Sequence, residues 1–92
     1  MMTDKIFDFI KQEYGININE LFGNCRKQNI VDIRNILIDI LYNDNGWTKK
    51  QIAEYFQKHR TTIIHSLQSS ENMKKYNPEY LKLYNEIKRY ER

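Results

Sequence analysis

Residues 48–66, TKKQIAEYFQKHRTTIIHS, decide the fold of this chain. Thr48 and Gln51 have the spacing of a capping box, in which two side chains accept hydrogen bonds from each other's backbone N–H groups at a helix start. Apolar residues at helical spacing then predict a short helix over about 49–56 and a second from about 61 to 72. Four polar residues separate the two helices, and small hydroxyl residues open the second. This layout predicts a helix-turn-helix, although many helix pairs joined by a short polar turn never touch DNA.

Outward from this motif, apolar residues recur with helical spacing in further segments, at about 4–14, 19–22, 31–42 and 78–90. Gly15 and Gly23 are placed to end the first two, because glycine accepts the left-handed backbone found after many helices. Asn77 followed by Pro78 is a typical helix start. The polar residues 24–29 predict a loop, and no stretch alternates as a half-buried strand would. The sequence therefore predicts an all-α fold: a small helical domain with a helix-turn-helix, plus an extra C-terminal helix.

Length and composition fit one domain. The chain has 92 residues, of which 40% are hydrophobic, so we expect residues 1–92 to form a single helical domain around one core. We find neither a secretory signal nor an apolar run of the roughly 20 residues that a membrane span needs. A single cysteine, Cys25, can form no internal disulfide, and we expect an unreactive thiol there. These features predict a cytoplasmic protein with no membrane partner.

The positive charge of the chain lies in its middle. Residues 1–22 carry a net charge of −2, residues 23–75 carry +4 and residues 76–92 carry +1. A basic patch on one part of a small domain is typical of a nucleic-acid binder. An ordinary solvated surface explains the same charge equally well, so charge alone does not decide between the two.

Three pieces of the sequence fall in a characteristic order: YGI at 14–16 followed by ELF at 20–22, RKQNIVDIR at 26–34, and the capped helix and turn at 48–66. With these pieces, residues 4–75 resemble the C-terminal DNA-binding domain of the bacterial replication initiator DnaA family. The resemblance implies a helix-turn-helix that binds double-stranded DNA. It also implies a basic loop, with Arg26, Lys27 and Arg34, that lies along the DNA backbone or reaches into the minor groove.

The chain departs from this family at positions that would read DNA. The family's signature Arg-Asp-His-Thr-Thr-Val is replaced by Lys58-His59-Arg60-Thr61-Thr62-Ile63. Gln57 stands in place of the glycines of the turn, and Asp32 stands where several members have arginine. The family's preference for one short A+T-rich box therefore does not carry over. These residues contain no Gly-rich phosphate loop, so we expect no ATP-driven melting of an origin by this chain.

The candidate DNA-binding residues carry either hydrogen-bond donors or small hydroxyls. They are Arg26, Lys27, Arg34, Lys49, Lys50, Lys58, His59, Arg60, Thr61 and Thr62. Arg60 is the leading candidate for base readout, since a guanidinium can donate two hydrogen bonds to guanine O6 and N7. A phosphate contact and a solvated turn residue are the alternatives for Arg60. We expect one of Thr61 and Thr62 to cap its helix and the other to face DNA.

The remaining residues near the motif have less specific roles. Three lysines suit phosphate contacts or simple solvation: Lys49, Lys50 and Lys58. His59 suits either a DNA contact or a place in the turn. His65 shares a helix face with Thr61, and we expect it to pack against the protein. Trp47 precedes the capping threonine, where we expect it to pack as a hydrophobic staple.

The leading functional hypothesis is sequence-selective binding of double-stranded DNA. The chain would then be a regulator or accessory factor of replication or transcription, from a phage or mobile element. The alternative is a protein–protein interaction module on a helix-turn-helix scaffold that no longer binds DNA, with the closing helix 78–90 as the surface for a protein partner. No zinc-binding arrangement, acid–base pair, activated nucleophile or cofactor motif is found. We therefore predict no enzyme activity, no cofactor, no metal and no small-molecule substrate.

Overall fold

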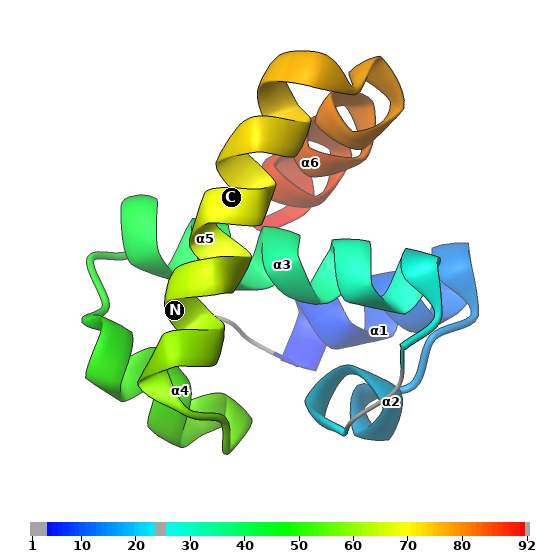
Figure 1. Ribbon diagram of the computed structural model, residues 1–92. Coiled ribbons are helices and arrows are strands. Elements are labelled where there is room, and N and C mark those ends of the chain that lie inside the picture. Colours follow the sequence, from blue (N-terminus) through cyan, green and yellow to red (C-terminus); the bar gives the residue numbers. More distant parts are fainter. Residues whose placement is uncertain (1–3, 24–25, 92) are drawn as a thin grey trace.

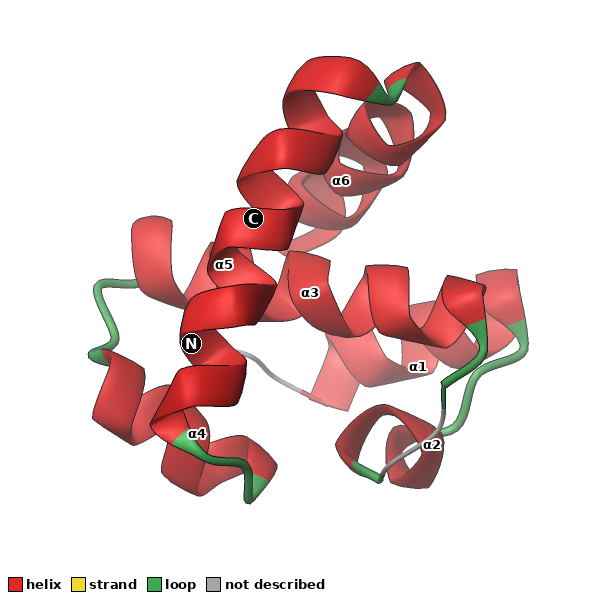
Figure 2. Ribbon diagram, viewed as in Figure 1, coloured by secondary structure: helices red, strands yellow, loops and turns green. Residues whose placement is uncertain are grey.

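The computed structural model describes residues 4–23 and 26–91. Within these residues it contains helices and no strand, which confirms the all-α prediction (Figure 2). The helices are α1 (Asp4–Tyr14), α2 (Ile18–Phe22), α3 (Gln28–Asn43), α4 (Lys49–Phe56), α5 (Arg60–Tyr76) and α6 (Pro78–Glu91). The helix-turn-helix is formed by α4 and α5, and α6 is the extra C-terminal helix that the sequence predicts.

The long helix α3 is the centre of the fold. It is buried over much of its length, and its buried hydrophobic residues are Ile30, Ile33, Ile36, Leu37, Ile38, Ile40 and Leu41. Figure 1 shows α5 crossing α3, with α1 and α2 on one side and α4 at the far end. Helices α2, α4, α5 and α6 all pack against α3. A helix that is covered on several faces buries more than a single stripe of residues, and the consecutive residues Ile36, Leu37 and Ile38 are all fully buried.

Two helix boundaries differ from the sequence-based expectation. Helix α3 begins at Gln28, within the stretch 24–29 expected to be a loop, and the Gln28 side-chain amide donates a hydrogen bond of 2.7 Å to Asp32 Oδ1. Helix α5 runs to Tyr76 rather than to about residue 72. Beyond residue 72, Met73 packs against the core and Lys74 Nζ lies 2.9 Å from Asp39 Oδ2. Tertiary packing therefore extends α5 beyond its weak local signals.

The closing helix α6 is capped and packed. Asn77 Oδ1 accepts hydrogen bonds from the backbone N–H groups of Glu79 (3.1 Å) and Tyr80 (3.2 Å), as an N-cap does. The buried face consists of Tyr80, Tyr84 and Ile87. Leu81 lies beside this face and is 39% exposed.

Two contacts attach α6 to α1, far away in the sequence. The Tyr14 hydroxyl donates a hydrogen bond of 2.8 Å to Glu86 Oε2. The rings of Phe9 and Tyr90 stack, with their centroids 4.2 Å apart. Desolvation raises the pKa of Tyr14, and the bonded Glu86 carboxylate raises it further. The extra helix is thus an integral part of the fold and not a loose extension.

A buried polar cluster joins α3, α5 and α6. Its centre is Asp39, which is 1% exposed. The Asp39 carboxylate accepts hydrogen bonds from Ser70 Oγ (2.7 Å) and Asn43 Nδ2 (2.6 Å) and lies 2.9 Å from Lys74 Nζ. The Tyr80 hydroxyl donates to Ser70 Oγ at 2.7 Å, and burial raises the pKa of Tyr80. Because a buried charge is tolerated only when it is paired, this cluster fixes how α5 and α6 cross α3.

Candidate nucleic-acid interface

Helix α4 begins with the capping box that the sequence predicts. The Gln51 N–H donates to Thr48 Oγ1 at 3.1 Å, and the Thr48 N–H donates to Gln51 Oε1 at 2.9 Å. The inner face of α4 is formed by Ile52, Ala53 and Phe56, which are buried. Trp47, just before the cap, packs edge-to-face on Tyr55 of α4, with the ring centroids 5.4 Å apart. It therefore packs against the protein, as expected.

The turn between α4 and α5 consists of residues 57–59, because α5 begins at Arg60. Gln57 adopts the left-handed conformation, with φ 56° and ψ 47°, a geometry that glycine usually supplies after a helix. The Lys58 N–H donates to the Ala53 carbonyl at 2.9 Å and closes the turn. The two helices are therefore joined by three residues, with the backbone conformation typical of glycine but without a glycine.

The first turn of α5 presents its side chains to solvent. Arg60, Thr61 and Thr62 are all exposed, and so is His59, the N-cap residue, whose side chain makes no capping bond. The expectation that one threonine caps the helix is wrong, because both threonines lie inside the helix. No acidic side chain lies in this turn. The free N–H groups and the helix dipole therefore favour an anion at this end of α5.

A groove separates this turn from the start of α3. We call it the α3–α5 groove; its volume is about 490 Å³, and its lining includes Arg26, Arg34, Asn35, Lys58, Thr62, His65, Ser66 and Ser69. It brings Arg26, which precedes α3, to the same hollow as Thr62 of α5. His65 was expected to pack against the protein, but it is exposed and lines the groove, because Ile63 and Ser66 take the inward positions of that helix turn.

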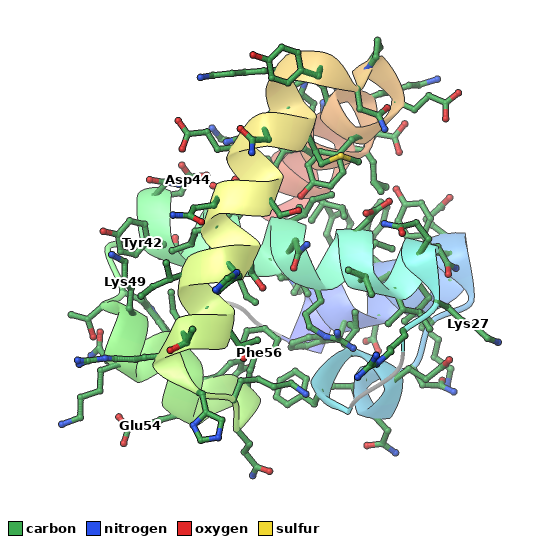
Figure 3. The ribbon with its side chains drawn as sticks, in the orientation of Figure 1. Lys27, Tyr42, Asp44, Lys49, Glu54 and Phe56 are labelled. Atoms are coloured by element: carbon green, nitrogen blue, oxygen red, sulfur yellow. The ribbon has the colours of Figure 1, made fainter. Side chains whose placement is uncertain are left out.

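The other predicted lysines lie on either side of α5. Lys27 is exposed and is the N-cap of α3. Lys50 is exposed on α4, whereas Lys49 is half-buried, with its Nζ 5.6 Å from the centre of the Tyr42 ring. Figure 3 shows Lys27 and Lys49 at opposite sides of the view, with α5 between them. The candidate lysines therefore flank α5 on both sides in this view.

Two predicted DNA contacts are held by the protein itself. Arg34 was placed in the basic loop, but it lies in α3, where its Nε donates to the Leu21 carbonyl at 2.6 Å and its Nη2 to the Glu20 carbonyl at 3.1 Å. Lys58 Nζ donates to the Gly23 carbonyl at 2.7 Å. Burial, and then the charge of Arg34, lower the pKa of Lys58. Both cations thus bind the end of α2.

Residues 3–69 match the family described as "Bacterial dnaA protein helix-turn-helix". The chain belongs to this family. The chromosomal replication initiator protein DnaA of Kosmotoga olearia is 37% identical over 68 residues, which cover 74% of this chain and 15% of that protein. The chain therefore corresponds to a small part of that relative. No solved structure matches it significantly. The end of α5 and all of α6 lie beyond the DnaA helix-turn-helix match.

The DnaA helix-turn-helix is a DNA-binding module, and the resemblance read from the sequence is confirmed. In the described part of the chain, no group of three or more His, Cys, Asp or Glu side chains could hold a metal ion. No helix there is long and apolar enough to cross a membrane. Cys25 lies outside the described residues. The sequence does not reveal the place of His65 in the groove. The buried cluster around Asp39 has one signal in the sequence, an aspartate flanked by Ile38 and Ile40.

Proposed function

We propose that this chain binds double-stranded DNA sequence-selectively, with the first turn of α5 in the major groove. One observation carries the proposal: Arg60, Thr61 and Thr62 are exposed together at a helix start that bears no acidic side chain. Membership of a DNA-binding helix-turn-helix family supports it. The major groove admits an α-helix and displays a distinct pattern of donors, acceptors and methyl groups for each base pair.

The residues of this turn suit different parts of that pattern. The guanidinium of Arg60 can donate two hydrogen bonds to guanine O6 and N7. A threonine methyl can pack on the methyl group of thymine, and its hydroxyl can bind a base edge or a phosphate. His59, the exposed N-cap residue of α5, can donate a hydrogen bond to a phosphate or a base. Because Arg60 and His59 replace the family's histidine and aspartate, we expect a target different from the family's A+T-rich box.

The basic pair, Arg26 and Lys27, forms a second contact across the α3–α5 groove. Both side chains are exposed, and Arg26 lines the groove that Thr62 enters from the other side. These side chains lie along the DNA backbone or in the adjacent minor groove. On the opposite flank, Lys49 and Lys50 contact phosphates. Such contacts fix the register of the protein on the duplex, whereas α5 supplies the selectivity.

In the cell, the chain is a regulator or accessory factor of replication or transcription. The relative named as a chromosomal replication initiator favours replication. Action in the cytoplasm and an origin in a phage or mobile element remain predictions. We infer a binding role and not a catalytic one, because the helix-turn-helix of this family is a DNA-binding module.

The test first enriches duplexes from a random pool with the wild-type chain. The affinities of Arg60→Ala and Lys50→Ala are then measured for an enriched duplex and for its variants that differ at single base pairs. We expect Arg60→Ala to lose about tenfold or more of the discrimination at one base pair, because a bidentate arginine–guanine contact contributes roughly 1–3 kcal/mol. Lys50→Ala should weaken all duplexes alike. If the pool yields no enriched sequence, selectivity is refuted; if no duplex binds, the scaffold serves a protein partner instead.

A further inference from the structure

The end of α2 is the place where two cations meet three backbone carbonyls. Lys58 Nζ bonds the carbonyl of Gly23, and Arg34 bonds those of Leu21 and Glu20, at 2.6–3.1 Å. The last carbonyls of a helix have no partner within the helix and carry a partial negative charge. Lysine and arginine side chains are therefore favourable ligands for them. Lys58 and Arg34 supply this cap from elsewhere in the chain.

The Lys58 bond connects segments that are 35 residues apart. Gly23 lies three residues before Arg26, and Lys58 lies two residues before Arg60. One bond therefore joins the chain just before the basic pair to the turn just before the recognition helix α5. A ring contact supports the same junction, since Phe22 of α2 packs on Phe56 of α4 with a centroid distance of 4.8 Å.

The surroundings of Lys58 favour this bond over a contact with DNA. Its side chain is half-buried in the α3–α5 groove and shares it with the Arg34 guanidinium. Burial and that neighbouring charge lower the pKa of Lys58, a cost that the Gly23 carbonyl helps to offset. If the Lys58 ammonium moved to bind a DNA phosphate, the Gly23 carbonyl would lose the hydrogen bond that Lys58 donates to it.

We propose that Lys58 is a positioning residue, which ties the turn of the helix-turn-helix to the end of α2 and so sets where Arg26 and Lys27 stand relative to α5. The inference rests on the DNA-binding function proposed above. Arg34 holds the same helix end from α3, so the two cations share one role. The spacing between the basic pair and α5 is then set before the duplex binds. Fewer residues have to be ordered upon binding than in a chain without this bond.

A double-mutant cycle tests this role. The affinity of Lys58→Met for an enriched duplex is measured by fluorescence anisotropy, alone and combined with Arg26→Ala and Lys27→Ala. Alone, the change should weaken binding about tenfold, because ordering one more loop residue upon binding costs roughly that factor. Without the basic pair, it should change the affinity little. Lys50→Met is the matched control, and its effect should be the same in both backgrounds.

The same cycle would overturn the proposal if Lys58→Met cost as much without the basic pair as with it. Lys58 would then be a direct phosphate contact, and the slope of log K against log salt would fall by about 0.9 as one contact is lost. Lys58→Arg, which keeps a donor and the charge, should retain most of the wild-type affinity if the tether is what matters.

A second readout needs no DNA, so it separates this inference from the proposed function. Trypsin cleaves after exposed arginine and lysine, and a loosened segment is cleaved faster. Cleavage after Arg26 and Lys27 should be several-fold faster in Lys58→Met than in Lys50→Met, at a temperature where circular dichroism shows both folded. If Lys58→Met does not fold, Lys58→Gln replaces it in the same comparison. Equal cleavage would overturn the tether, whether or not the wild type binds a duplex.

Discussion

Replacing Asp39 with alanine should destabilise the fold more than any surface change. The Asp39 carboxylate is 1% exposed and receives hydrogen bonds from Ser70 and Asn43 as well as the charge of Lys74, which lies 2.9 Å away. Asp39→Ala removes all three interactions and leaves the Ser70 hydroxyl with no acceptor inside the core. It also opens a small cavity between α3 and α5.

The expected loss follows from the burial of the cluster. Breaking a buried ion pair by removing one partner costs about 3–5 kcal/mol. Lys74 is 26% exposed and can turn to water, so we expect a loss near the lower end, about 3 kcal/mol. Domains of this size have a free energy of unfolding of about 5–15 kcal/mol. The melting temperature should therefore fall by more than about 10 °C.

Urea unfolding followed by far-UV circular dichroism measures this loss. The matched control is Asp44→Ala, because Asp44 pairs with Lys88 at 3.6 Å and both side chains are about one-third exposed (31% and 33%). A surface pair of this kind contributes less than about 1 kcal/mol. If Asp39→Ala unfolds at the same urea concentration as Asp44→Ala, the cluster does not hold α3, α5 and α6 together, and the reasoning is refuted.

Two further predictions concern the backbone and the pH. Gln57→Gly should stabilise the fold by up to about 1 kcal/mol, because Gln57 adopts a left-handed conformation that glycine takes without steric cost; an unchanged or lower melting temperature would contradict this. Burial raises the pKa of Tyr84 to about 12, from 10.0, and the folded state therefore holds this proton more tightly than the unfolded state. The contribution of Tyr84 to the free energy of unfolding should be constant below pH 10 and be lost as the pH rises from 10 to about 12. Urea titrations over this range should therefore show a shallower fall in Tyr84→Phe than in the wild type; identical profiles would contradict the raised pKa of Tyr84.

Local chemistry explains which parts of the fold could be predicted from the sequence. The capping box at Thr48 and Gln51 needs only residues three apart, and both bonds are present. The caps and apolar spacing also locate α1, α4 and α6 almost to the residue. Helix α5 is longer than expected because residues beyond 72 have tertiary partners that helical spacing does not reveal. Met73 packs against the core, and Lys74 pairs with Asp39 of α3.

The candidate site was less predictable, because the atoms that a lysine or arginine side chain binds can lie far away in the sequence. Lys58 and Arg34 look like phosphate contacts in a basic stretch. The carbonyls that they bind lie 35 residues from Lys58 and 13 or 14 residues from Arg34. Arg60 and the two threonines, by contrast, lie at a helix start that the sequence locates to within one residue, and their exposure follows from the inward position of Ile63.

The central claim is that this chain binds duplex DNA through one basic face. The most direct test is fluorescence anisotropy of the purified chain with an enriched duplex over a series of salt concentrations. With Lys58 and Arg34 bound to carbonyls, five cations remain for the duplex: Arg26, Lys27, Lys49, Lys50 and Arg60. About four or five phosphate contacts predict a slope of log K against log salt between about −3.5 and −4.5. No binding to any duplex, even at the lowest salt, would contradict the account.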